Sequence, residues 1–212
     1  MKYIIMCGGK YPFWKTPKHL SKIKGEPVVA RTIRLLKAVG VDDIAISSND
    51  YRFENLGVEV LHHENSFDVN EPTSYWVDAF YPMNEPVCYL FGDVVFSKSA
   101  IKQIVDDEPE DSIQFYASAA PFPDEYIKPW AEPFAFKVYD TERFKKAIQI
   151  TKEHQDQGDF WRMPVSWELW QVIRRTTLNV ILPDYYIIRD YTCDIDEPGD
   201  IKKIERYIVG DD

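Results

Sequence analysis

Apolar residues follow two alternating patterns along the chain: short continuous runs, and longer stretches in which they recur at helical spacing. Continuous runs, of which residues 2–7 and 87–91 are the clearest, predict strands that are buried on both faces, as in a parallel sheet. Positions three or four residues apart, such as Val29, Ile33 and Leu36, predict a helix. The alternation of the two patterns, with short connections, predicts an α/β fold.

The elements expected from these patterns span the chain. We expect strands over residues 2–7, 43–48, 58–61, 87–91, 112–119, 133–139, 178–182 and 185–188. We expect helices over 27–39, 97–106, 142–153 and 166–174, one that is capped by Thr73 or Ser74, and a last one that ends at Tyr207. Ser97 and Thr141 are the expected N-caps of two of them, and residues 154–163 are expected to form a loop. The predicted architecture is a three-layer α/β/α sandwich with a mostly parallel central sheet.

Composition narrows the class of protein. A length of 212 residues favours a single domain over residues 1–212, with two domains as the less favoured alternative. The net charge of −10 argues against a general nucleic-acid binder, which needs a basic face. Three cysteines without paired spacing predict buried thiols in a reducing compartment. With no visible signal peptide or membrane-spanning run, we expect a cytoplasmic protein without a membrane partner.

Positive charge gathers in the stretch that follows the first predicted strand. Gly8 and Gly9 come first, and glycine lets backbone N–H groups approach an anion and form a nest for phosphate. Lysines then add the charge that a triphosphate needs; they are Lys10, Lys15, Lys18, Lys22 and Lys24. The stretch matches neither the P-loop nor the dinucleotide-binding pattern. It is either a phosphate-binding loop or a solvated surface loop.

Carboxylates occupy two further positions of interest. Asp93 ends the apolar run 87–91, and Asp194 and Asp196 lie two residues apart in an extended segment, so that their side chains point the same way. Ligands of open α/β sheets bind beyond the carboxyl ends of the strands, and Mg²⁺ takes one or two carboxylates together with phosphate oxygens and water. The alternatives are that Asp93 caps the next helix and that Asp196 caps the last one.

Taken in order, three segments resemble the nucleotidyltransferase superfamily with a GT-A-type fold. They are Gly8-Gly9 through Pro17-Lys18 to Gly25-Glu26-Pro27, then Gly92-Asp93, then Asp194-Ile195-Asp196-Glu197-Pro198-Gly199-Asp200. The superfamily includes sugar-phosphate nucleotidyltransferases, phosphocholine cytidylyltransferases and molybdenum-cofactor guanylyltransferases. The resemblance covers essentially the whole chain. It implies a Mg²⁺-dependent enzyme that transfers NMP from an NTP to a phosphorylated small metabolite and releases pyrophosphate.

The resemblance implies three sets of site residues. The catalytic set contacts phosphate and consists of Lys18, with Lys15 in the place of a family arginine. The nucleotide-binding set is Gly8, Gly9, Lys10, Thr73, Ser74 and Gly92. The metal set, for Mg²⁺, is Asp93 and Asp196. The chain departs from the family at Tyr11-Pro12-Phe13, where the family loop carries small residues.

Other readings stay open. The pair Asp194 and Asp196 motivates a GT-A glycosyltransferase that uses a nucleotide sugar, and the bulky loop motivates a non-catalytic nucleotide-binding protein. Aromatic residues in 126–136 and 160–170 form either core packing or a wall around a sugar or a choline-like cation. Arg162 or Lys128 could hold an acceptor phosphate. The expected partners are an NTP and a phosphorylated small molecule, and a homodimer is an open alternative to a monomer.

Overall fold

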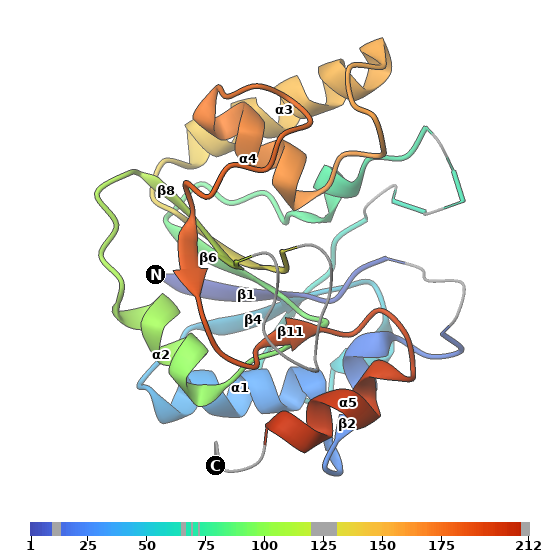
Figure 1. Ribbon diagram of the computed structural model, residues 1–212. Helices are drawn as coiled ribbons and strands as arrows, with labels where there is room; N and C mark the ends of the chain where they lie inside the picture. Colours follow the sequence, from blue (N-terminus) through green and yellow to red (C-terminus); the bar gives the residue numbers. More distant parts are fainter. Residues whose placement is uncertain (10–13, 65–66, 69, 72, 120–130, 209–212) are drawn as a thin grey trace.

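The computed structural model describes residues 1–9, 14–64, 67–68, 70–71, 73–119 and 131–208. The chain forms three layers, with a central sheet between two groups of helices (Figure 1). One face carries α3 (Thr141–Gln157) and α4 (Ser166–Arg174), which pack on each other. The other side carries α1 (Val28–Ala38), α2 (Lys98–Asp106) and α5 (Asp200–Tyr207). The predicted α/β/α sandwich is confirmed.

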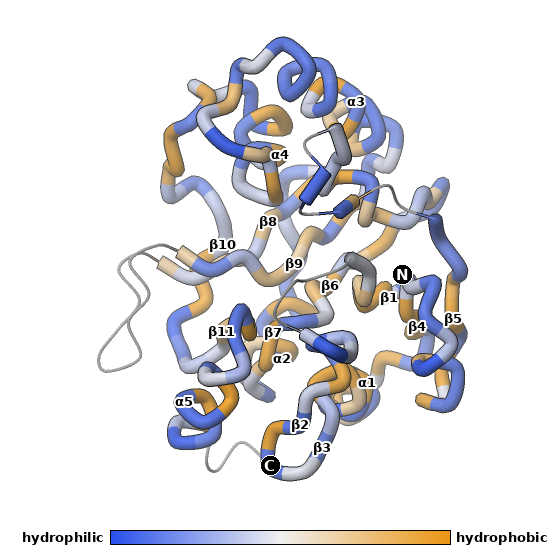
Figure 2. Tube along the Cα trace, turned by 90° about the vertical axis from the view of Figure 1, so that its right-hand side faces the viewer, coloured by the Kyte–Doolittle hydropathy of each residue, from blue (hydrophilic) through white to orange (hydrophobic). Residues whose placement is uncertain are grey.

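The central sheet has the order β10-β8-β9-β6-β1-β4-β5, which Figure 2 shows as a row across the molecule. Its strands are β1 (Lys2–Met6), β4 (Ile44–Ser47), β5 (Glu59–Leu61), β6 (Val87–Phe91), β8 (Ile113–Ser118), β9 (Pro133–Val138) and β10 (Tyr186–Ile188). Neighbouring strands are parallel, except that β9 runs antiparallel to both β6 and β8. The mostly parallel sheet agrees with the prediction.

Two short antiparallel pairs lie outside this sheet. One joins β2 (Lys22–Ile23) to β3 (Glu26–Pro27), and the other joins β7 (Val94–Val95) to β11 (Cys193–Asp194). Single 3₁₀ turns form η1 (Lys18–Leu20), η2 (Tyr51–Phe53) and η3 (Trp76–Ala79). The β7–β11 pair brings the closing segment of the chain to the segment that follows β6.

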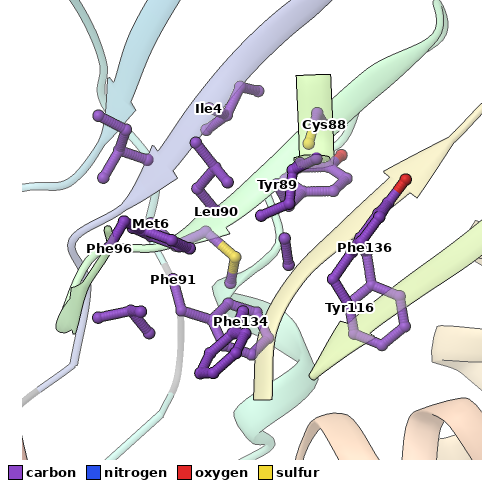
Figure 3. Close-up of a cluster of buried hydrophobic side chains, with 14 of the residues drawn as sticks. Ile4, Met6, Cys88, Tyr89, Leu90, Phe91, Phe96, Tyr116, Phe134 and Phe136 are labelled. Atoms are coloured by element: carbon purple, nitrogen blue, oxygen red, sulfur yellow. The ribbon is translucent and has the colours of Figure 1, made fainter. Parts of the chain in front are cut away.

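The two central strands are buried on both faces, as their continuous apolar runs predict. Ile4, Ile5 and Leu90 have no exposed surface. Figure 3 shows residues of both strands packed together with Phe134, the first of the buried residues of β9. All three cysteines are buried, as the sequence predicts. This packing fixes where β1 and β6 end, and the loops that follow them start from fixed positions.

The prediction of a helix capped by Thr73 or Ser74 is wrong, because only the single 3₁₀ turn η3 forms there. Its N-cap is Tyr75, and no side chain caps it. The Ser74 hydroxyl donates to the Asp68 carbonyl at 2.8 Å and accepts from the Asp68 N–H at 3.1 Å. Serine that bonds local backbone in this way competes with a helix start.

The boundaries of α3 also differ from the prediction. Asp140 caps the helix, not Thr141: its carboxylate accepts from the Arg143 N–H at 2.9 Å. The helix continues to Gln157, so part of the expected loop 154–163 is helical. It ends at Gly158, whose φ of 75° lies in the left-handed region that glycine adopts readily.

The strand expected over 178–182 is absent from the described structure. Val180, Ile181 and Leu182 are each more than 40% exposed, so this apolar run lies at the surface and is not covered by a neighbouring strand. A short apolar run does not by itself show that it is buried. None of the helices in the described ranges is long and apolar enough to cross a membrane.

Candidate active site

A cavity of about 270 Å³ opens at the carboxyl ends of β1 and β6. Residues far apart in the sequence line it, including Gly8 after β1, Asp93 after β6 and Ser166 at the start of α4. The carboxyl ends of parallel strands are where α/β proteins bind ligands. The segments that the sequence singled out therefore meet at the expected edge of the sheet.

An ion pair between Lys18 and Asp93 lies in this cavity. The Lys18 Nζ and an Asp93 carboxylate oxygen are 2.5 Å apart, with side chains 4% and 20% exposed. Burial raises the pKa of Asp93, but the positive charge of Lys18 and its hydrogen bond to the carboxylate act more strongly and hold that pKa below its usual value. Asp93 is therefore ionised at neutral pH. It does not cap α2, since Ser97 does so by accepting from the Ala100 N–H at 2.8 Å.

His19, which the sequence did not single out, lines the same cavity. It is 3% exposed and lies edge-on to Phe53. Burial lowers its pKa to about 4, although the charge of Asp93 acts in the opposite direction. His19 is therefore neutral at pH 7 and leaves Lys18 as the cation beside Asp93.

The closing segment supplies two more carboxylates to the cavity wall, Asp194 and Asp196. Pairing of β11 with β7 positions them, together with a bond from the Ile195 N–H to the Asp93 carbonyl at 3.0 Å. The Asp196 carbonyl accepts from the Trp14 indole N–H at 3.0 Å. Asp196 does not cap the last helix, because Gly199 is the N-cap of α5 and no side chain caps it.

These carboxylates fit one kind of metal site. Within the described residues, no three or more histidines, cysteines or acids are arranged to hold a metal ion by themselves. Mg²⁺ does not need such a cage, because it is commonly bound by one or two carboxylates, substrate phosphates and water. Asp93, Asp194 and Asp196 line one cavity, and their carboxylates would fit a divalent metal ion that takes its remaining ligands from a substrate and water.

A second cavity, of about 360 Å³, adjoins the first at Gly8. Gly9 also lines it and has a φ of 91°, a conformation that favours glycine. Aromatic side chains border it at Tyr51, which is 74% exposed, and at Phe67. Gly8 thus lies between the cavity that contains Lys18 and Asp93 and a second cavity with aromatic edges.

Gly92 has a structural reason to be glycine. Its N–H donates to the Met6 carbonyl at 3.0 Å, and a Cβ atom would lie 2.4 Å from that oxygen and 2.7 Å from the Cys7 sulfur. Gly92 is not among the described residues that line either cavity. The close approach of β6 to β1 requires the absence of a side chain there.

Other predicted site residues lie away from both cavities. Thr73 and Lys15 are exposed and Ser74 is buried, and none of them is among the described lining residues. Lys10 and Lys128 fall outside the described residues. Of the predicted set, the structure brings together Gly8, Lys18, Asp93 and Asp196 in the first cavity.

The far side of the first cavity is partly aromatic. Trp76, Phe91 and Trp167 line it, whereas Trp170 is packed in the core. Arg162 also lines it, as does Glu132, which is 1% exposed. Of these residues, sequence reasoning had named Arg162 and Trp167 as candidates for the site, but not Trp76, Phe91, Glu132 or Ser166. Isolated polar residues carry no signal until the fold places them at a cavity.

Comparison with known families decides what this arrangement is. Residues 3–155 match the MobA-like NTP transferase domain. The chain belongs to this family. The predicted superfamily and the prediction of a nucleotidyltransferase enzyme are thereby confirmed. The match includes Gly8, Lys18 and Asp93, and it ends before the segment that carries Asp196.

Solved structures share the fold of this family member along nearly its whole length. The inositol-1-phosphate CTP transferase from T. maritima is 17% identical, with a TM-score of 0.56 over 99% of this chain and 97% of that one. CTP:phosphocholine cytidylyltransferase from Streptococcus pneumoniae (LicC) is 16% identical, with a TM-score of 0.53 and 97% of each chain covered. HddC from Yersinia pseudotuberculosis, complexed with GMP-PN, is 16% identical, with a TM-score of 0.53 over 97% of this chain and 98% of that one. A comparison with curated proteins found no match.

Proposed function

We propose that this nucleotidyltransferase transfers NMP from an NTP to a phosphorylated small metabolite in a Mg²⁺-dependent reaction. The observation that carries the proposal is the Lys18–Asp93 pair, which lies in one cavity with Asp194 and Asp196 and beside Gly8. A phosphate-binding cation and a pair of carboxylates for a hard metal ion are what this reaction requires. The inositol-1-phosphate and phosphocholine transferases that share the fold act on phosphorylated metabolites, according to their names.

The nucleotide would extend across Gly8. The base would lie in the second cavity, where Tyr51 and Phe67 can stack on it, since aromatic side chains stack on any nucleobase. Its phosphates would then lie along the backbone of Gly8 and Gly9, with Lys18 next to them. Stacking on side chains and hydrogen bonds to the backbone do not specify which nucleobase the NTP carries.

The reaction itself needs no nucleophile from the protein. An oxygen of the acceptor phosphate attacks the α-phosphorus of the NTP, a new P–O bond forms, and the bond to the departing pyrophosphate breaks. Lys18 neutralises the charge that develops on the phosphates, and Gly8 and Gly9 orient them through backbone N–H groups. Asp93 and Asp196 would hold Mg²⁺, which when bound supplies further positive charge to these phosphates.

Ligand-induced stabilisation tests the proposal. Melting temperatures would be measured with CTP, UTP, GTP and ATP, each with and without Mg²⁺, for the wild type, Asp93→Asn and the exposed control Asp42→Asn. A ligand that binds only the folded state raises the melting temperature. We expect one NTP to give a Mg²⁺-dependent rise that Asp93→Asn loses and Asp42→Asn keeps. The same NTP should then release pyrophosphate with one member of a panel of phosphorylated metabolites.

Two outcomes would count against the proposal. A rise with a nucleotide sugar and none with any NTP would favour the glycosyltransferase. A Mg²⁺-dependent rise without pyrophosphate release across the panel would favour a nucleotide-binding protein without turnover.

A further inference from the structure

The N-terminus of α4 is buried and has no side-chain cap. Its N-cap is Val165, whereas serine, threonine, aspartate and asparagine prefer this position because their side chains accept first-turn N–H groups. The first N–H groups of any helix have no partner within the helix. Here they belong to Ser166, Trp167 and Glu168, which are 1%, 4% and 4% exposed. A buried helix end without a cap needs another acceptor.

A second observation at this helix end points to a ligand. The Ser166 hydroxyl is fully buried, and no described residue forms a hydrogen bond with it. Ser166 and Trp167 both line the first cavity. Buried hydroxyl groups in proteins almost always have a partner, and leaving one without a partner destabilises the fold. The cavity is where an atom that bonds this hydroxyl could bind.

Arg162 adds a positive charge beside the helix end. Its Nε donates to one Glu168 carboxylate oxygen at 2.9 Å, and the other Glu168 oxygen accepts from the Val165 N–H at 2.9 Å. Glu168 thus ties Arg162 to the first turn of α4. The described residues form no hydrogen bond with the terminal nitrogens of the Arg162 guanidinium, which lines the same cavity.

We propose that Ser166, Arg162 and the N-terminus of α4 bind the phosphate of the acceptor metabolite. The positive end of the helix dipole and its free N–H groups favour an anion. Two guanidinium nitrogens match two phosphate oxygens, and the serine hydroxyl can donate to a third. The proposal rests on the proposed function, which assigns the NTP phosphates to Gly8 and Lys18 and leaves this end for the second substrate.

Binding of inorganic phosphate, measured by isothermal titration calorimetry, tests the site. The variants are Ser166→Ala and Arg162→Gln, with the exposed Arg206→Gln as the matched control at constant ionic strength. Each site variant loses a charge-assisted hydrogen bond, so we expect about tenfold weaker phosphate binding, and no change in the control. Arg162 has a side chain 57% exposed, so its substitution leaves the fold intact even if Ser166→Ala does not. Equal affinity in the wild type and Arg162→Gln would overturn the proposal.

The variant Val165→Asn separates ligand binding from a purely structural role. The asparagine amide oxygen can accept the first-turn N–H groups without adding charge. We expect Val165→Asn to raise the melting temperature without phosphate and to weaken phosphate binding. A helix end with a purely structural role would show only the first of these two changes. A higher melting temperature with unchanged phosphate affinity would overturn the proposal.

The proposed function and this acceptor site can fail separately. Asp93→Asn is expected to lose NTP binding and keep phosphate binding at α4. The Ser166 and Arg162 variants are expected to do the reverse. In turnover with an acceptor from the panel, they should raise the KM for the acceptor about tenfold and leave the KM for the NTP unchanged. Phosphate binding that depends on Ser166 in a protein without NTP binding would support this site and reject the nucleotidyltransfer.

Discussion

Gly92 occupies a position where one methyl group has no room. A Cβ atom would lie 2.4 Å from the Met6 carbonyl oxygen, and neither central strand can move because both are packed on two faces. We expect Gly92→Ala to lower the free energy of unfolding by about 2 kcal/mol, measured by urea denaturation. Gly199→Ala is the matched control, because nothing lies within 4 Å of its added Cβ. A similar change in both variants would contradict the steric explanation.

His19 makes stability depend on pH. Its pKa falls from 6.5 to about 4 on folding because it is buried. Between these values the unfolded chain binds a proton that the folded chain does not, so stability falls as the pH decreases from about 6.5 to 4. This pKa shift corresponds to a loss of about 3 kcal/mol in the free energy of unfolding. Urea denaturation in EDTA from pH 7.5 to 4 should show this decline, and His19→Asn, which cannot titrate, should show a smaller one. Parallel profiles would reject the assignment to His19.

Single residues were predictable where a motif carried them. Gly8, Lys18 and Asp93 each follow a recognisable strand or proline, and the structure places all three in the first cavity. Gly92 was assigned to the nucleotide, whereas its surroundings give a steric reason for the glycine. Ser166 was predicted only as the start of a helix, since its missing partner depends on residues that are distant in the sequence.

Among the elements, α2 is joined at its N-terminus to the segment that precedes β11. The Ser97 hydroxyl caps this helix and also donates to the Asp190 carboxylate at 2.6 Å. Its N–H donates to the Thr192 hydroxyl at 2.9 Å. These bonds fasten the segment that leads into β11 and to Asp196.

Removing this hydroxyl should affect both stability and the proposed metal site. We expect Ser97→Ala to lower the free energy of unfolding by about 1 kcal/mol, and to weaken Mg²⁺-dependent NTP binding because the segment before Asp196 is loosened. Ser99→Ala, at an exposed position of the same helix, should change neither. Normal Mg²⁺–NTP binding by a destabilised Ser97→Ala would limit the role of Ser97 to the cap.

Elements with a long pattern were predicted well, and those without one were not. The strands β1 and β6 and the helices α1 and α4 form where apolar spacing placed them. The two-residue strands β7 and β11 are too short to show a pattern, and they form because they pair with each other. The run 178–182 has the composition of a strand, but composition does not tell which segment will cover it.

At the scale of the whole molecule, we propose that residues 1–212 form one domain. A single connected core runs from Tyr3 to Ile208 and includes both central strands and helices of both outer layers. Such a core predicts one cooperative unfolding transition. Calorimetry should give a single peak whose calorimetric and van't Hoff enthalpies agree. Two separable transitions would instead support the alternative of two domains.

The late position of Asp194 and Asp196 has a consequence for protein synthesis. Both reach the cavity only when β11 pairs with β7, and about a hundred residues separate these two strands in the sequence. Ribosomes add roughly 5–20 residues per second, so on the order of several seconds pass between the synthesis of β7 and that of β11. Until then a nascent chain can already carry Gly8, Lys18 and Asp93, but Asp194 and Asp196 are missing from the cavity. Nascent chains that end before β11 should therefore bind Mg²⁺–NTP poorly, and chains in which β11 has paired with β7 should bind it with full affinity.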